Sequence, residues 1–180
     1  MKDISYHILD IVQNSLHACA TRTEISVRDD STAGTLELKI IDNGIGMPEE
    51  VIRKVTDPFY TTSVTKKVGL GLPLLKQNAE QTGGTFSVES VEKKGTTVTA
   101  VFNRNHIDMI PEGNQALTMK SLIAANPGKD FVFRYSCNRG AFDMDTDEIR
   151  KNLDVISINT REVLDYIVDF IRGNLQELDK

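Results

Sequence analysis

The chain has 180 residues, of which 39% are hydrophobic and 26% are charged, a composition typical of a soluble globular protein. Its net charge of −5, with no long run of Lys and Arg, argues against a protein that binds nucleic acid through phosphate contacts. Cys19 and Cys137 stand far apart and offer neither a disulfide framework nor a metal-binding pair. No apolar stretch reaches membrane-spanning length, and the first ten residues lack the core of a signal peptide. We therefore expect a cytoplasmic protein that binds neither nucleic acid nor a membrane.

The first predicted element is an amphipathic helix over residues 4–20, because its apolar residues recur at about 100° per residue. The opposite side of this helix is polar. The elements expected after it are strands at 24–28 and 35–42, a short helix from Pro48, a loop over 57–70, a helix ending near Gly83, and strands at 84–90 and 96–102.

These strands come as hairpins, so the sheet should be mixed and mostly antiparallel, with helices on one face. The predicted fold is an α/β (α+β) two-layer sandwich rather than a doubly wound nucleotide fold.

The chain becomes polar and rich in turn residues after about residue 104. A helix is expected over 115–125, a hairpin within 129–145 with its turn near 138–140, and a last helix from about Thr160 with a clear apolar stripe. No linker separates this part from the first. We expect one domain at 1–103 and a small α/β extension of unknown role at 104–180.

Two groups of residues suggest chemistry. Asp10 and Asn14 are four apart, so both project from one face of the first helix, where a carboxylate and an amide can hold a water and a divalent cation. The segment VGLGLPLLKQNAEQTGG, residues 68–84, runs from a glycine-spaced loop into a helix. The unpaired amides and the dipole at such a helix start favour an anion, usually phosphate.

Two further segments complete the pattern. IIDNGIGM, residues 40–47, is a strand that ends in Asp42 and is followed by a glycine turn, and KKGTTVTAVF opens the final strand of the domain at Gly95 and Thr96. Together the segments resemble the motifs of the GHKL superfamily of ATPases, which includes DNA gyrase, the heat-shock chaperone ATPase, histidine kinases and mismatch-repair ATPases. HILDIVQNSLHACAT is similar to the N box, DNGIGM and GLGLP to the two glycine boxes, DPFYTT to the phenylalanine box of histidine kinases, and KKGTTV to the last conserved strand. The resemblance covers about residues 4–103.

The resemblance implies a Bergerat-type ATP-binding fold and a role for each matching residue. Asn14 would ligate Mg²⁺ bridging the phosphates of ATP, Asp42 would accept a hydrogen bond from the adenine amino group, and Thr96 would hold the adenine through water. Lys66 or Lys67 on the lid would reach a phosphate. The remaining implied binding residues line the base pocket or face the phosphates: Gly44, Gly46, Met47, Thr61, Gly69, Leu70, Gly71 and Leu72.

Asp10 is implied as the catalytic group. It stands where family members that hydrolyse ATP commonly have Glu, and its shorter side chain weakens the inference of hydrolysis, because a general base must reach the water. Ala18 stands where histidine kinases usually have a second Asn. His17 and Ala18 bring the N box nearer the mismatch-repair pattern, whereas the lid and the second glycine box are nearer histidine kinases.

A zinc site is the rival interpretation of the polar side of the first helix, which carries His7, Asp10, Asn14 and His17. Because ten residues of helix span roughly 15 Å, the two histidines are too far apart to reach one ion.

Two functions follow from the resemblance. The N box begins within ten residues of the start, with no phosphoacceptor hairpin ahead of it, so we do not expect autophosphorylation in cis. The first expectation is a stand-alone kinase that phosphorylates a separate regulatory protein, as anti-sigma serine kinases of the superfamily do. The alternative is an ATP-gated binding module with little or no catalysis. The extension at 104–180 could supply a dimerisation surface; the oligomeric state is left open.

Overall fold

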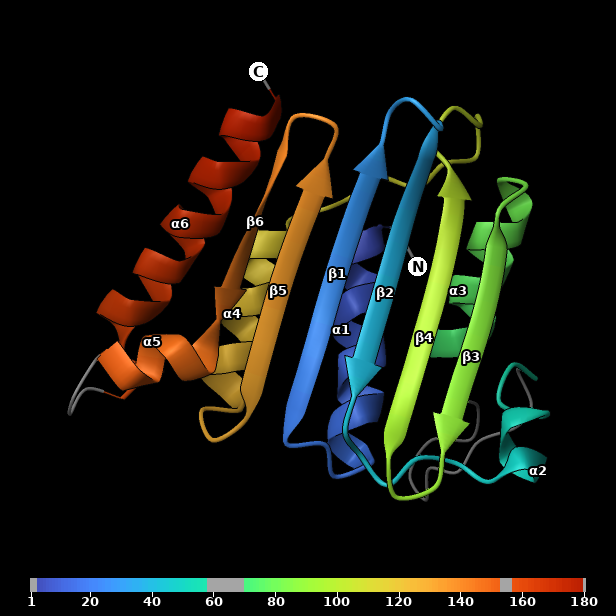
Figure 1. The fold of residues 1–180 in the computed structure, drawn as a ribbon, viewed down its shortest axis with the longest axis horizontal. Coiled ribbons are helices and arrows are strands. Elements are labelled where there is room, and N and C mark those ends of the chain that lie inside the picture. Colours follow the sequence, from blue (N-terminus) through green and yellow to red (C-terminus); the bar gives the residue numbers. More distant parts are fainter. Residues whose placement is uncertain (1–2, 58–69, 153–156, 180) are drawn as a thin grey trace.

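The computed structural model describes residues 3–57, 70–152 and 157–179. The elements in chain order are α1 (Ile4–His17), β1 (Arg22–Asp30), β2 (Thr35–Asp42), α2 (Glu49–Ile52), α3 (Gly71–Gln81), β3 (Thr85–Val91), β4 (Gly95–Asn103), α4 (Gln115–Ala125), β5 (Asp130–Cys137), β6 (Gly140–Asp145), α5 (Thr146–Asn152) and α6 (Arg161–Asp179). Within the described ranges, six strands form one sheet in the order β3-β4-β2-β1-β5-β6 (Figure 1).

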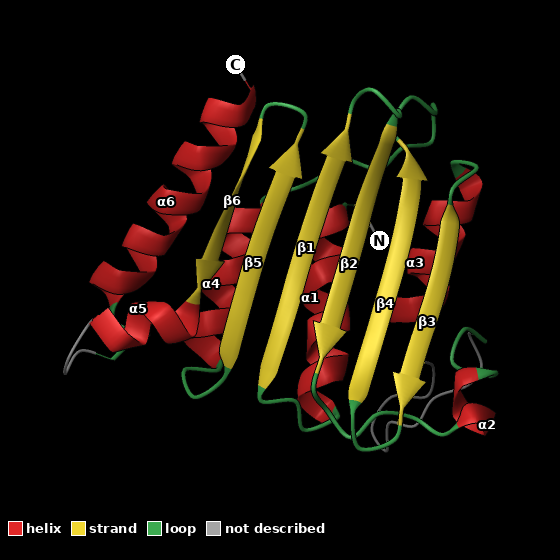
Figure 2. Ribbon diagram, in the orientation of Figure 1, coloured by secondary structure: helices red, strands yellow, loops and turns green. Residues whose placement is uncertain are grey.

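The sheet is mixed. β1 and β5 run parallel, and the other neighbouring strands pair antiparallel. Helices α1, α3 and α4 cover one face of this sheet, and α6 lies against α4 and β6 at one side (Figure 2). The predicted two-layer fold, a mostly antiparallel sheet with helices on one face, is confirmed.

The core lies between the sheet and the helices. Side chains alternate between buried and partly exposed along β1 and β2, which is the period of a strand with one covered face. The buried positions meet the apolar side of α1, whose members recur at helical spacing. The fully buried side chains of these three elements include Ile4, Ile8, Ile25, Val27, Leu36, Leu38 and Ile40.

Two elements, α1 and β1, differ from the predictions by two residues or more at an end. α1 ends at His17 rather than at residue 20, because Ala18 caps it and Cys19 takes a positive φ of 61° that no helix continues. β1 is longer than the predicted strand at 24–28 and spans Arg22–Asp30. Pairing with β2 on one side and β5 on the other fixes the backbone along nearly its whole length.

The hairpin predicted within 129–145 is present as β5 and β6, and it extends the same sheet. Its first strand pairs with β1 from Arg22↔Asp130 to Asp29↔Cys137. The short helix α5 follows β6 directly and was not predicted. Its buried first residue, Thr146, accepts a hydrogen bond from the Phe131 amide at 2.8 Å, which ties the start of α5 to the start of β5.

The segment between β4 and α4 lies at the end of the molecule opposite to α2, where polar contacts hold it (Figure 1). Arg104 bridges Asp29 Oδ2 at 2.8 Å and Glu112 Oε1 at 3.0 Å. The Ser5 amide and hydroxyl both donate to the Glu112 carbonyl, at 3.0 and 2.8 Å. Burial, together with the carboxylates of Glu112 and Asp29, raises the pKa of Tyr135 beside this cluster.

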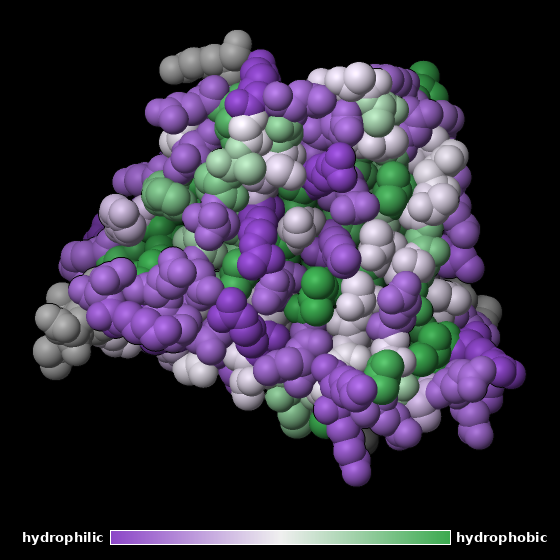
Figure 3. Space-filling model, viewed as in Figure 1, coloured by the Kyte–Doolittle hydropathy of each residue, from purple (hydrophilic) through white to green (hydrophobic). Residues whose placement is uncertain are grey.

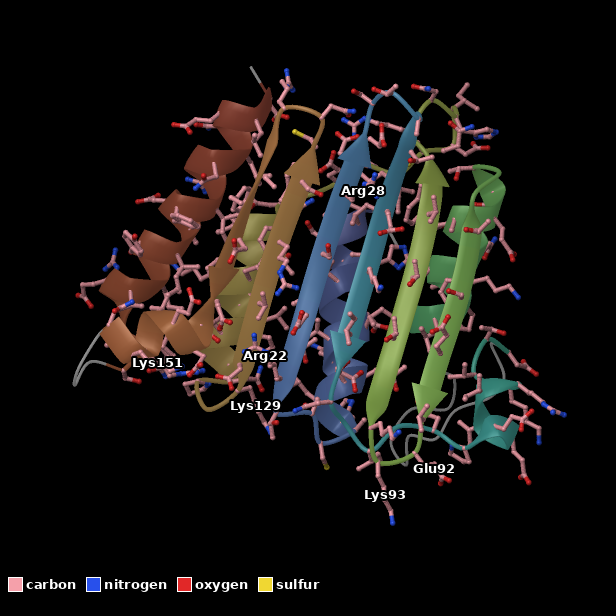
Figure 4. The ribbon with its side chains drawn as sticks, viewed as in Figure 1. Arg22, Arg28, Glu92, Lys93, Lys129 and Lys151 are labelled. Atoms are coloured by element: carbon pink, nitrogen blue, oxygen red, sulfur yellow. The ribbon has the colours of Figure 1, made fainter. Side chains whose placement is uncertain are left out.

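The other face of the sheet is largely polar in the space-filling view (Figure 3). Ion pairs cross three of its strands: Arg22 on β1 meets Asp145 on β6 at 2.8 Å, and Arg134 on β5 meets Glu24 on β1 at 2.6 Å. Figure 4 shows Arg22 near the end of the sheet where β1 begins. In the described part of the chain, no helix is both long and apolar enough to cross a membrane.

Candidate functional site

The centre of the candidate site is the carboxylate of Asp42, the last residue of β2. It is only 9% exposed, and both of its oxygens are engaged. Ser15 on α1 donates its hydroxyl to Oδ2 at 2.7 Å, and the Gly44 amide donates to Oδ1 at 2.8 Å. Two donors from different elements therefore fix the orientation of this carboxylate, while each oxygen keeps capacity to accept a further hydrogen bond.

The loop after Asp42 is fastened to α1 and to the loop that leads into β1. The Asn43 side chain accepts the amides of Thr21 and Arg22, both at 2.9 Å, and donates to the Thr21 hydroxyl at 2.8 Å. The Ile45 amide donates to the Ala18 carbonyl at 2.8 Å. These contacts hold the first glycine box against the C-terminal end of α1.

The same loop is also fastened to the β3–β4 turn, which carries Glu92 and Lys93 at the lower end of the sheet in Figure 4. The Lys93 amide donates to the Ile45 carbonyl at 2.7 Å, and the Met47 amide donates to Ser90 Oγ at 2.8 Å. Gly46 has a φ of +66° and lies against the Val91 carbonyl. The glycine loop is therefore a fixed wall of the site, held at both sides.

Thr96 lies directly opposite Asp42 in the antiparallel register of β2 and β4. Its Oγ1 lies 2.9 Å from Ser90 Oγ, and Ser90 Oγ donates to the Gly95 carbonyl at 2.9 Å. Ser90 has one hydroxyl proton and donates it to that carbonyl. Thr96 is therefore the donor in its hydrogen bond with Ser90. The lone pairs of Thr96 Oγ1 are then left as acceptors beside Asp42.

Gly95 has a φ of +116° and lies against the backbone at the end of β2. Replacing it by Ala is expected to lower the free energy of unfolding by about 2 kcal/mol or more. A Cβ there would overlap the Asp42 carbonyl and lie 3.0 Å from Asn43 Cα, and backbone cannot turn aside as a side chain can. Urea unfolding measures the change.

The matched control is Gly173→Ala in α6, where an added Cβ meets no atom within 4 Å. That substitution is expected to stabilise the protein by about 0.5–1 kcal/mol, since Ala is the better helix former. Equal unfolding midpoints for the Gly95 variant and the wild type would contradict the close approach.

The second part of the site is the contact between α1 and the start of α3. A Cβ built on Gly71 would overlap Asp10 Oδ2 and lie 3.6 Å from Asn14 Nδ2. The structure therefore brings Gly71, Asp10 and Asn14 together. Asp10 is half-buried, whereas Asn14 is exposed and open to a ligand.

The start of α3 has no described side-chain cap. Leu70 occupies the N-cap position without a side-chain hydrogen bond, and the first turn has no acidic residue. Pro73 lacks an amide hydrogen, so the amides of this turn that have no acceptor among the described residues are those of Gly71 and Leu72, beside Asp10 and Asn14. Such a turn favours an anion. The predicted residues Thr61, Lys66 and Gly69 lie outside the described residues.

Sequence reasoning missed Ser15 and Ser90, the residues that orient Asp42 and connect Thr96 to the glycine loop. Ser15 looked like part of the apolar stripe of the first helix, and Ser90 like an ordinary strand residue. One signal pointed to Ser15: it is a polar residue, next to Asn14, on the side of the first helix that is otherwise apolar.

The chain belongs to the family of histidine kinase-, DNA gyrase B- and HSP90-like ATPases, whose model matches residues 2–106. It is a GHKL ATPase domain like the catalytic domains of histidine kinases.

The curated relatives include sensor histidine kinase ZraS of Escherichia coli, 29% identical over 59% of this chain and 23% of that protein. Sporulation kinase C of Bacillus subtilis is 29% identical over 52% of this chain and 22% of that protein. The chain spans only 15% to 23% of the length of the first curated relatives that it matches.

Among solved structures, the N-terminal domain of a DNA repair protein matches with a TM-score of 0.52 at 15% identity, over 79% of this chain and 51% of that one. This likeness shows a common fold alone. It covers more of the chain than residues 2–106, so part of the extension shares the fold as well.

Proposed function

We propose that this protein binds Mg²⁺-ATP at the end of the sheet where β2 finishes, and that it transfers the terminal phosphate to a separate regulatory protein in the cytoplasm. The observation that carries the proposal is the pairing of two features at this end. One is the buried, doubly oriented carboxylate of Asp42, and the other is the uncapped start of α3 against Asp10 and Asn14. Family membership supports the nucleotide, and the kinase names of the relatives support the transfer.

The base of ATP is assigned to Asp42 and its surroundings. Asp42 would accept a hydrogen bond from the adenine amino group, using the lone pairs that Ser15 and Gly44 leave free. The acceptor lone pairs of Thr96 Oγ1 suit a bridging water. Gly44, Gly46 and Met47 would line this pocket, in a loop whose position is fixed before any ligand arrives.

The phosphates are assigned to the start of α3. The amides of Gly71 and Leu72 have no acceptor among the described residues, the Leu70 backbone lies beside them, and Thr61, Lys66 and Gly69 are proposed to join them. Asn14 fits Mg²⁺, because its exposed side chain offers an amide oxygen, a hard ligand of the kind that this ion takes. The bound ion would neutralise phosphate charge.

Asp10 is the proposed catalytic residue. Its carboxylate lies against Gly71, so it stands beside the phosphate end of the site, and in the transfer it would orient or deprotonate the accepting hydroxyl. The alternative function is an ATP-gated binding module in which a partner recognises the nucleotide-bound form. The short side chain of Asp10 weakens the inference of hydrolysis, which such a module does not need, but it does not distinguish the module from a kinase.

Calorimetric titration with a non-hydrolysable ATP analogue and Mg²⁺ tests the nucleotide site. We expect micromolar binding by the wild type and a loss of at least about tenfold in Asn14→Ala and Asp42→Asn, because the first removes a ligand of Mg²⁺ and the second removes the charge that strengthens the hydrogen bond from the adenine amino group. No binding by the wild type would overturn the proposal.

Labelled ATP then distinguishes the two functions. Label moved to a partner protein, and lost in Asp10→Asn, supports the kinase. Nucleotide-dependent capture of a partner without movement of label supports the binding module.

A further inference from the structure

A polar contact also joins α1 and α3 away from Asp10, Asn14 and Gly71. His7 on α1 is 0% exposed, and its Nε2 lies 2.8 Å from Asn78 Nδ2 on α3. The same two helices bury apolar side chains in the hydrophobic core, among them Ile4, Ile8, Ile11, Leu75 and Ala79. A pair of aliphatic residues would fill this place without the cost of burying polar groups, so the contact calls for an explanation other than packing.

The bond requires a neutral imidazole. The amide nitrogen of Asn78 can only donate, so His7 Nε2 accepts and the ring proton is on Nδ1. Burial lowers the pKa of His7 to about 4, and the carboxylate of Asp3, the N-cap of α1, acts in the opposite direction. His7 Nδ1 has no partner among the described residues. The ring therefore makes one directional bond, and that bond points at α3.

The two helices are antiparallel, because contacts move forward along α1 as they move backward along α3. His7 meets Asn78, and further along, Asp10 and Asn14 meet Gly71. Asn78 and Gly71 are two turns apart on α3, about 10 Å along its axis. A directional bond at one place and a close approach at the other fix how far α3 can slide along α1.

Building on the proposed function, we propose that His7 and Asn78 are a positioning pair, which sets the start of α3 against Asp10 and Asn14 and so determines affinity for the phosphates of the nucleotide. The base pocket does not depend on this pair. Ser15 holds Asp42, Asp42 accepts the Gly44 amide, and Ser90 holds Thr96, and none of these contacts passes through α3.

The test compares two ligands in the full chain carrying Asn78→Leu. This substitution keeps the side-chain size and removes the hydrogen bond. We expect affinity for the Mg²⁺-ATP analogue to fall about tenfold, because small displacements at a reacting site are costly. Affinity for adenosine, which lacks phosphates, should change less than about twofold, and calorimetry measures both.

Thr82→Val is the matched control. Thr82 is also buried at the end of α3, and its hydroxyl donates to the Ala79 carbonyl at 2.8 Å and accepts the Asn103 amide at 3.0 Å, so it ties α3 to β4 instead of α1. This control should lower the urea midpoint as Asn78→Leu does, while leaving both affinities unchanged.

A double-mutant cycle adds a second readout. The double variant His7→Leu with Asn78→Leu leaves no unpaired polar group, so it should bind the analogue no more weakly than either single variant. If Asn78→Leu does not fold, the titrations with the analogue and with adenosine are carried out on this double variant instead.

Equal losses for the analogue and adenosine, or no loss for either, would overturn the positioning role while leaving the nucleotide site intact. A wild-type protein that binds neither compound would instead overturn the proposed function, and this inference with it.

Discussion

A chain that ends after Asn103 is expected to lose cooperative unfolding, although it contains every motif of the family. The deletion removes β5, which pairs with β1 along nearly its whole length, and α4, which packs on α1. Phe131 and Phe133 are both fully buried. Burying each such side chain contributes about 1.5–3 kcal/mol, against a typical total stability of about 5–15 kcal/mol.

Circular dichroism during urea unfolding measures this expectation. The control is a chain that ends after residue 159, which loses α6 but keeps all the strands in the described sheet, and which should show a sharp transition at a lower midpoint. A sharp transition at the wild-type midpoint for the chain ending at residue 103 would show that the extension does not stabilise the first part.

Gly71→Ala is expected to separate function from stability. The added Cβ would overlap Asp10 Oδ2, which is the end of a side chain and can rotate away. Ala also restricts the unfolded chain more than Gly does, so the unfolding midpoint should stay equal or rise. The rotation nevertheless moves the Asp10 carboxylate from its place beside the phosphate end, so nucleotide-dependent phosphate transfer should fall at least about tenfold.

Measurements of transfer rate and urea midpoint on the same preparations check this prediction. Gly128→Ala is the control, because a Cβ there meets no atom within 4 Å, and we expect it to leave the transfer rate unchanged. Full activity in Gly71→Ala would argue against a catalytic role for Asp10. A large loss of stability in that variant would show instead that Asp10 cannot move away.

The sequence predicted the two-layer fold and the family, because periodicity and glycine spacing are local properties of the chain. It did not show that β5 joins the sheet beside β1. The alternation of apolar and polar residues indicates which face of a strand is buried, but not which strand lies next to it. One signal was available: the buried run from Phe131 to Phe133 is continuous rather than alternating, as in strands covered on both faces.

Single contacts were harder to predict. The pair of His7 and Asn78 joins residues 71 positions apart, and both looked like ordinary polar residues of amphipathic helices. The predicted end of α1 was also wrong, because cysteine is not a residue type that usually takes a positive φ, as Cys19 does. The roles of the site residues remain predictions, which the titrations above are designed to test.

The parallel pairing of β1 with β5 also has a consequence for how the chain is made. Nearly 100 residues separate the two strands, so at about 5–20 residues per second a ribosome adds β5 roughly 5–20 s after it has added β1. During that interval β1 has an open edge next to apolar side chains, the situation in which strands pair with the wrong neighbour. We expect nascent chains stalled before β5 to bind chaperones, and their release to follow the arrival of Phe131 and Phe133.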